Sequence, residues 1–112
     1  MNNKVLLTAF FLRKAKRFLK KYHSLQKSLV ELERALILNP KMGISYGSNI
    51  YKVRLADESK GKGKSGGFRV ITYAIEETSD ATNIYLITIF DKSEEASIDK
   101  DDIKEILKSE GL

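Results

Sequence analysis

The spacing of apolar residues predicts one strand and two helices in the first forty residues. Residues 5–10 are almost wholly apolar, which indicates a short strand. From Phe11 the apolar positions recur with helical spacing, and a second such stretch follows Ser24, a residue type that favours helix N-caps. The two apolar stripes are Phe11, Ala15, Phe18, Leu19 and Tyr22, and then Leu25, Leu29, Leu32 and Leu36. Asn39 and Pro40 end the second helix, because the residue before proline avoids helical backbone angles.

Strand-like patterns follow. Residues 41–49 contain two glycines and predict a loop. Runs rich in β-branched and aromatic residues predict strands at residues 50–56, 68–75 and 84–90. A polar, glycine-rich loop at residues 57–67 separates the first two of these strands.

A last helix is predicted near the C-terminus. Asp99 can cap it, Ile103 and Leu107 face a core, and Gly111 ends it. Because turns rather than helices join the later strands, an antiparallel sheet is favoured. We therefore expect an α+β fold, with a small curved antiparallel sheet of about four strands, two N-terminal helices packed on one face, and a short C-terminal helix.

Composition indicates one domain and excludes several classes of protein. The 112 residues are enough for a single domain spanning residues 1–112. The chain has no cysteine and only His23 as a histidine, which excludes a disulfide framework and a thiolate or His-rich metal site. The longest apolar run is too short to cross a bilayer, and no signal-peptide pattern is present. We expect a cytoplasmic protein without membrane contact, metal or other cofactor.

Charge is distributed unevenly along the chain. The net charge is +5, but residues 1–75 carry sixteen Lys or Arg and four Asp or Glu, whereas residues 76–112 carry four and eleven. A polyanion is therefore expected to meet the first two-thirds of the chain. A solvated basic helix with an acidic tail would show the same pattern, so charge alone leaves nucleic-acid binding open.

Cationic and uncharged residues alternate along the predicted strand at residues 50–56. Lys52 and Arg54 share one face of it, because side chains alternate along a strand. Arg69 lies early in the next strand, and the loop between them adds Lys60, Lys62 and Lys64. Gly63-Lys64-Ser65 matches the end of a P-loop, but Glu58 stands where its first glycine is needed and a strand follows instead of a helix. Nucleotide hydrolysis is therefore excluded.

The residues of this region resemble those of a known family. The strand at residues 50–56 followed by Gly63-Lys64-Ser65-Gly66-Gly67-Phe68-Arg69 is similar to the central signature of RelE/HigB-type toxins. The predicted helical turn near residues 20–25 and the stretch at residues 89–93 are also similar to that family. The resemblance covers nearly the whole chain. It implies the toxin of a type II toxin–antitoxin module, which cleaves mRNA in the ribosomal A site and is neutralised by a cognate antitoxin.

The resemblance also implies a set of active-site residues. Lys52 and Arg54 match basic positions of the family's active strand, and Arg69 matches an arginine that contacts the scissile phosphate. Lys92 stands where the family places further polar active-site residues. Asp91 is a candidate for an orienting or proton-accepting carboxylate, although an Asp at the end of a strand is more often a turn residue. The family's later arginine and C-terminal catalytic tyrosine have no counterpart, since no tyrosine follows Tyr85. The expected RNA-binding residues are Arg13, Lys16, Arg17, Lys20, Lys60, Lys62 and Lys64.

The implied reaction is metal-independent RNA cleavage. The ribose 2′-hydroxyl attacks the adjacent phosphate, and clustered cations stabilise the charge of the transition state. Two other functions stay open. A ParE-like toxin would use the same fold to inhibit DNA gyrase, and a nucleic-acid-binding module would need no catalysis, because fold alone does not determine function.

Overall fold

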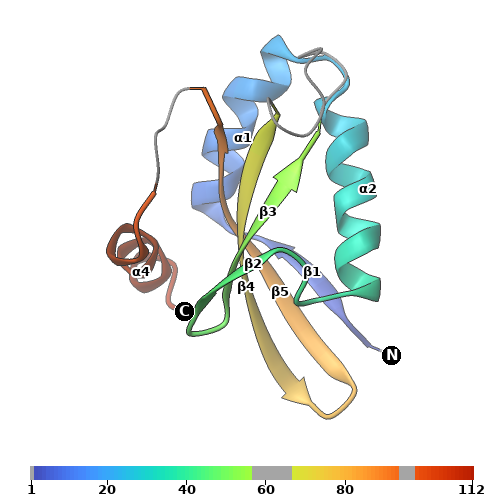
Figure 1. Cartoon of the computed structure of the whole chain (residues 1–112), viewed down its shortest axis with the longest axis vertical. Coiled ribbons are helices and arrows are strands. Elements are labelled where there is room, and N and C mark those ends of the chain that lie inside the picture. Colours follow the sequence, from blue (N-terminus) through green and yellow to red (C-terminus); the bar gives the residue numbers. More distant parts are fainter. Residues whose placement is uncertain (1, 57–66, 94–97) are drawn as a thin grey trace.

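The computed structural model describes residues 2–56, 67–93 and 98–112, which form the predicted helices and strands in order together with one additional strand (Figure 1). The helices are α1 (Ala9–Lys21), α2 (Leu25–Leu38) and α4 (Lys100–Ser109). The strands are β1 (Lys4–Leu7), β2 (Ile44–Gly47), β3 (Ile50–Leu55), β4 (Phe68–Thr78) and β5 (Ala81–Asp91). No helix among these described residues is long and apolar enough to cross a membrane.

Within the described residues, five strands form one sheet in the order β1-β5-β4-β3-β2. The neighbouring pairs β2–β3, β3–β4 and β4–β5 are antiparallel, as expected, whereas β1 runs parallel to β5. The sheet is therefore mixed and has one strand more than expected. The pattern of a single strand carries no information about the direction of its neighbour, so the parallel edge could not be predicted from residues 5–10.

The additional strand is β2, which the sequence predicted to be a loop. It pairs with β3 through Ile44 opposite Lys52 and Ser45 opposite Tyr51, with an irregularity between Ser45 and Gly47. The connecting turn uses positive φ angles of 54° at Ser48 and 67° at Asn49. Such angles suit the tight turns that continue the twist of paired strands. Ser-Asn is a weaker signal for this turn than Asn-Gly, which is why the hairpin was missed.

The start of α1 also differs from the prediction. The first strand ends at Leu7, and Thr8 is the N-cap of α1. The Thr8 hydroxyl accepts a hydrogen bond from the Phe11 amide (3.0 Å) and donates one to the Leu86 carbonyl (2.9 Å). This buried side chain therefore begins the helix and attaches it to β5. The predicted starts of the other two helices are confirmed, since α2 begins after Ser24 and Asp99 caps α4 by accepting from the Asp102 amide. Strands β4 and β5 are longer than predicted.

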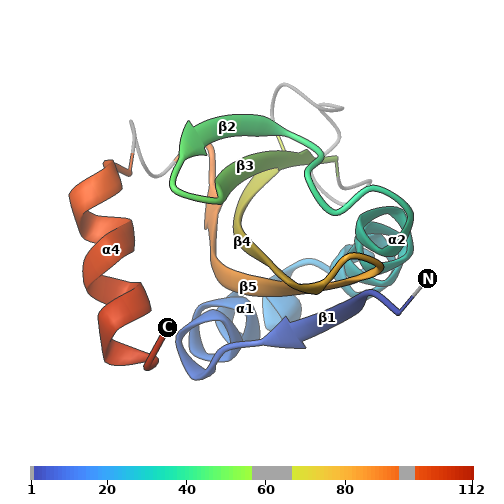
Figure 2. The same cartoon turned by 90° about the horizontal axis from the view of Figure 1, so that it is seen from below.

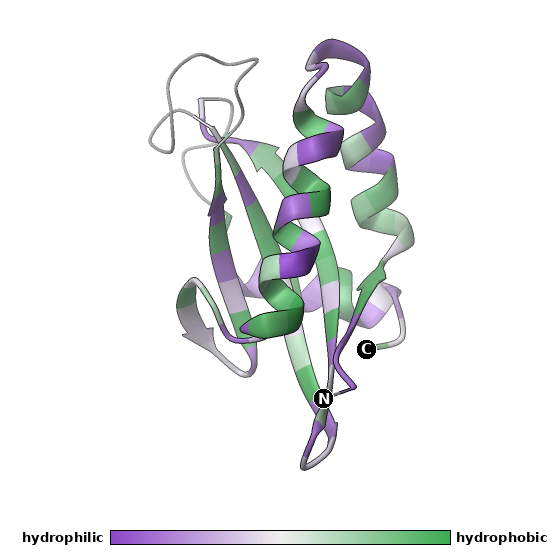
Figure 3. Ribbon diagram, turned by 90° about the vertical axis from the view of Figure 1, so that its right-hand side faces the viewer, coloured by the Kyte–Doolittle hydropathy of each residue, from purple (hydrophilic) through white to green (hydrophobic). Residues whose placement is uncertain are grey.

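The two faces of the sheet have separate cores. α1 and α2 cover one face, where Phe11, Phe18 and Leu32 pack against Val53, Phe68 and Ile89, among others. Figure 3 shows the two helices side by side, with hydrophobic and hydrophilic residues alternating along each. α4 packs on the other face through Ile103 and Leu107, and Figure 2 shows it apart from the other two helices beside the curved sheet. The expected packing of the N-terminal helices on one face is confirmed.

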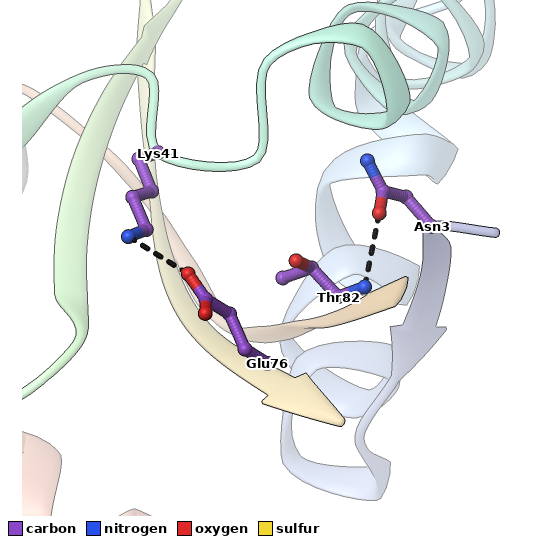
Figure 4. A network of polar contacts seen from close by, with 4 residues as sticks. All are labelled: Asn3, Lys41, Glu76 and Thr82. Carbon is purple, nitrogen blue, oxygen red and sulfur yellow. Dashed lines mark hydrogen bonds and ion pairs between the residues drawn. The ribbon is translucent and has the colours of Figure 1, made fainter. Parts of the chain in front are cut away.

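Polar contacts join several elements at the end of the sheet near the N-terminus (Figure 4). Asn3 donates to the Ile37 carbonyl (2.9 Å) and accepts from the Thr82 amide (2.9 Å), which connects β1 with α2 and β5. Lys41 pairs with Glu76 at 3.1 Å, and the hydrogen bond to that carboxylate raises the pKa of Lys41. Both partners are exposed, so this ion pair contributes little stability.

Candidate active site

Strands β3 and β4 bring three cations to one face of the sheet. Arg54 and Arg69 are directly opposite in the antiparallel register, and Lys52 lies two residues away on β3. Directly opposed side chains point to the same face with Cβ atoms about 4.5–5.5 Å apart. Lys52 shares that face because it is opposite Ile71, which belongs to the core under α4. The pairing of β3 with β4 therefore brings Arg69 to Lys52 and Arg54, from which it is distant in sequence.

Arg69 is buried, which is unusual for a charged residue. Its side chain is only 4% exposed, and Nη1 donates to the Phe68 carbonyl at 3.1 Å. Burial lowers the pKa of the Arg69 guanidinium, and the facing charge of Arg54 lowers it further. The sheet places Arg69 between neighbouring strands, so solvent reaches little of it. An anion bound at this face would interact favourably with both guanidinium groups.

Tyr46 is an additional residue of this site that the sequence analysis missed. It lies on β2, and the Lys52 ammonium is 5.5 Å from the centroid of its ring. That distance is within the range of cation–π attraction. Tyr46 is half-buried and packs against the core under α4. The alternation of Ile44 and Tyr46 was the available signal, but the surrounding glycines suggested a loop.

The structure does not bring Asp91 to this face. Asp91 is opposite Phe68, whose side chain lies in the core under α1 and α2, so its register directs it away from Arg69. It is 2% exposed, and Oδ1 accepts hydrogen bonds from the Ser93 amide (2.9 Å) and hydroxyl (2.8 Å). Asp91 therefore organises the turn after β5. Lys92 is exposed at the same end of the sheet, where its amide donates to the Gly67 carbonyl.

The predicted RNA-binding residues of α1 form a second basic surface. Arg13, Lys16, Arg17 and Lys20 are all exposed. The guanidinium groups of Arg13 and Arg17 lie over the rings of Phe10 and Phe18, at 5.6 and 4.8 Å from the centroids. Because α1 covers the face opposite the Lys52–Arg54–Arg69 cluster, the two basic surfaces lie on different sides of the sheet. Lys60, Lys62 and Lys64 lie outside the described residues.

The described part of the chain offers no group of three His, Asp or Glu side chains suited to a metal ion. The charged side chains that β3 and β4 present near the candidate site are the cations Lys52, Arg54 and Arg69. A preorganised cation pair at the edge of an apolar core can bind a phosphate and stabilise additional negative charge on it, since charges interact more strongly where water is scarce.

Two comparisons with known proteins identify the fold and the family. Residues 3–110 match the family model described as the RelE toxin of the RelE / RelB toxin–antitoxin system. The structure is similar to that of a double mutant of the E. coli toxin RelE in the free state, with a TM-score of 0.59. Sequence identity to that protein is 14%, over 97% of this chain and 98% of the other, so this likeness establishes the fold. The expected fold is confirmed, and the match over nearly the whole length shows that this chain belongs to the RelE toxin family.

Proposed function

We propose that this toxin is a ribosome-dependent mRNA endoribonuclease that stops translation and is neutralised by a cognate antitoxin. The observation that carries the proposal is the opposition of Arg54 and buried Arg69, with Lys52 beside them on the same face. A phosphodiester of single-stranded RNA fits this arrangement, because side chains directly opposite each other in a sheet are close enough to share one ligand and guanidinium groups bind phosphate oxygens in a bidentate manner.

The proposed reaction uses the 2′-hydroxyl of the RNA as the nucleophile. Its oxygen bonds to the adjacent phosphorus while the bond from phosphorus to the 5′-oxygen breaks, leaving a cyclic phosphate and a 5′-hydroxyl. One proton leaves the 2′-hydroxyl and one is taken up by the 5′-oxygen, so the reaction needs no water or cofactor. Arg54 and Arg69 stabilise the negative charge that grows on the phosphoryl oxygens. The ribosome supplies the in-line arrangement of the mRNA, which lowers the entropic part of the barrier.

The α1 surface has a separate role in this proposal. Its exposed cations, on the side of the sheet away from the cleavage site, contact phosphates of ribosomal RNA. Such contacts position a protein and contribute affinity without reading sequence. One face of the toxin therefore meets the ribosome while the other meets the mRNA.

Expression of the toxin is expected to arrest growth by destroying translated messages. Primer extension on RNA from an induced culture is expected to show cuts inside coding regions, and these cuts should disappear when translation initiation is blocked. Intact messages together with gyrase-dependent DNA breaks would contradict this proposal and favour a ParE-like toxin. Intact messages without DNA damage would favour a nucleic-acid-binding module.

The cognate antitoxin is proposed to bind beside the basic surface of α1. An apolar groove of about 390 Å³ lies there, and it is lined mainly by side chains of α1 and α2. Its lining residues are Leu7, Phe11, Leu19, His23, Gln26, Leu29, Val30, Glu33 and Leu86. Three of the apolar members are more than a third exposed, namely Leu7, Leu19 and Val30. An amphipathic antitoxin helix with an acidic rim would cover both the groove and the neighbouring cations.

This arrangement predicts salt-dependent association. The association rate of toxin and antitoxin is expected to fall at least roughly tenfold between ~0.05 M and ~0.5 M salt, because long-range charge attraction is screened. Reversing charges in Lys16→Glu/Lys20→Glu should slow association at low salt, whereas Lys108→Glu, on α4, serves as the control. Stopped-flow mixing measures these rates. A rate that is independent of salt, or an antitoxin footprint confined to residues 76–112, would contradict this prediction.

A further inference from the structure

Tyr46 stands at one end of a row of charged side chains. Arg69 faces Arg54, Lys52 follows Arg54 on the same face of β3, and the Tyr46 ring lies against the Lys52 ammonium. The row therefore runs from a buried arginine to a half-buried aromatic ring. Proteins that bind single-stranded nucleic acid combine these two features, with cations along the backbone and aromatic rings for the bases.

The local backbone explains why Tyr46 reaches this row. Ile44 is directly opposite Lys52, and the irregularity between Ser45 and Gly47 shifts the register at Tyr46 itself. Such irregularities redirect a side chain in a sheet. On the other side, the Lys100 ammonium from α4 approaches Gly47, since a Cβ built there would lie 3.3 Å from it. Lys100 therefore lies near the residue that follows Tyr46, while Lys52 lies against the Tyr46 ring itself.

Other aromatic residues on this face are less suited to contact the same nucleotide. Tyr73 and Tyr85 are opposite each other with ring centroids 6.3 Å apart. Tyr73 is four residues from Arg69 along β4, or roughly 13 Å at the usual rise of a strand. Phe90 is opposite Arg69 but only 4% exposed. Tyr46 combines partial exposure with direct contact to a cation of the cluster.

We propose that Tyr46 is the base-stacking residue of the cleavage site, and that its ring holds the nucleobase next to the phosphate bound by Arg54 and Arg69. This inference rests on the proposed endoribonuclease function. The ring contributes affinity and orientation, while the cations stabilise the transition state. Stacking accepts any base, because every base has an aromatic face. Tyr46 therefore adds affinity for RNA without strict sequence preference.

The test compares Tyr46→Leu, Tyr46→Phe and Tyr73→Leu in cleavage of ribosome-bound mRNA under single-turnover conditions with excess toxin. Leucine keeps apolar packing but removes the ring, and Tyr46→Leu is expected to lower the efficiency of cleavage roughly ten- to a hundredfold, mainly by raising the half-saturating toxin concentration. Tyr46→Phe keeps the ring and should cleave within about threefold of wild type. Tyr73→Leu is the matched control from the same face and should change cleavage less than about threefold.

A second arm uses mRNA with an abasic nucleotide on either side of the cleavage position. If Tyr46 stacks on one of these bases, removing that base should weaken wild-type cleavage by a similar factor, and Tyr46→Leu should then add no further loss. A leucine penalty that stays unchanged on both abasic messages would overturn the proposal, since Tyr46 would then act only by holding Lys52. Equal losses in the Phe and Leu variants would overturn it in favour of a role for the hydroxyl. Wild-type cleavage of Tyr46→Leu would also refute it. A wild-type toxin that cuts no message at all would overturn the proposed function itself, and this inference with it.

Discussion

Replacing Arg69 by alanine is expected to reduce cleavage of ribosome-bound mRNA by two to three orders of magnitude. The guanidinium is held in place by burial and by its hydrogen bond to the Phe68 carbonyl, so it needs little reorganisation when charge develops on the phosphate. Losing one preorganised donor of this kind typically costs about 3–4 kcal/mol of transition-state stabilisation, or roughly a hundred- to thousandfold in rate. Single-turnover cleavage of ribosome-bound mRNA measures the effect.

Burial of Arg69 requires a control for folding. Alanine would leave a cavity at this position, whereas Arg69→Met fills a similar volume without the charge. Because the pKa of Arg69 is lowered by folding, the folded state disfavours its charged form at every pH below that pKa. Arg69→Met should therefore still fold and yet fail to cleave.

Two further measurements complete this test. Arg34→Ala removes an exposed arginine on α2 and should leave cleavage unchanged. Ribosome binding should persist in the Arg69 variants, since the cations of α1 are unaffected. If folded Arg69→Met cuts at the wild-type rate, the cluster described here is not the active site, and Lys92 becomes the next candidate. The structure makes Asp91 a weaker candidate, because its side chain belongs to the other face of the sheet.

Replacing Phe68 by alanine is expected to lower the free energy of unfolding substantially. Phe68 is fully buried, and its ring makes edge-to-face contacts with Phe18 at 5.1 Å and Tyr22 at 5.2 Å between centroids. It therefore joins β4 to α1. Removing a buried Phe side chain costs about 3–5 kcal/mol, because it loses buried apolar area and leaves a cavity. That is a large part of the roughly 5–15 kcal/mol by which small domains are stable.

Urea unfolding followed by circular dichroism checks this prediction. Phe10→Ala is the matched control, since Phe10 is only partly buried at the start of α1, and it should cost much less. Phe68→Ala that unfolds within about 1 kcal/mol of the wild type would contradict the assignment of Phe68 to the centre of this core. Comparing the Phe68 and Arg69 variants also separates the roles of two neighbouring residues, because Phe68 faces the helices while Arg69 faces the site.

The sequence by itself determined the elements whose patterns are local. Helical spacing located α1 and α2, the Asn39-Pro40 pair ended α2, and Asp99 marked the start of α4. Alternation along β3 was enough to place Lys52 and Arg54 on one face. These features depend on residues a few positions apart, so they can be recognised without knowing how distant segments meet.

The tertiary structure decided everything that depends on strand pairing. The register of β3 with β4 set Arg69 opposite Arg54, and the register of β4 with β5 turned Asp91 to the other face. Pairing with β3 also converted the expected loop into β2 and placed Tyr46 beside Lys52. The physical reason is that side chains in a sheet alternate between faces, so a shift of one residue in register exchanges the two faces. Register is set by the packing of the whole sheet and by its turns, and no single strand contains that information.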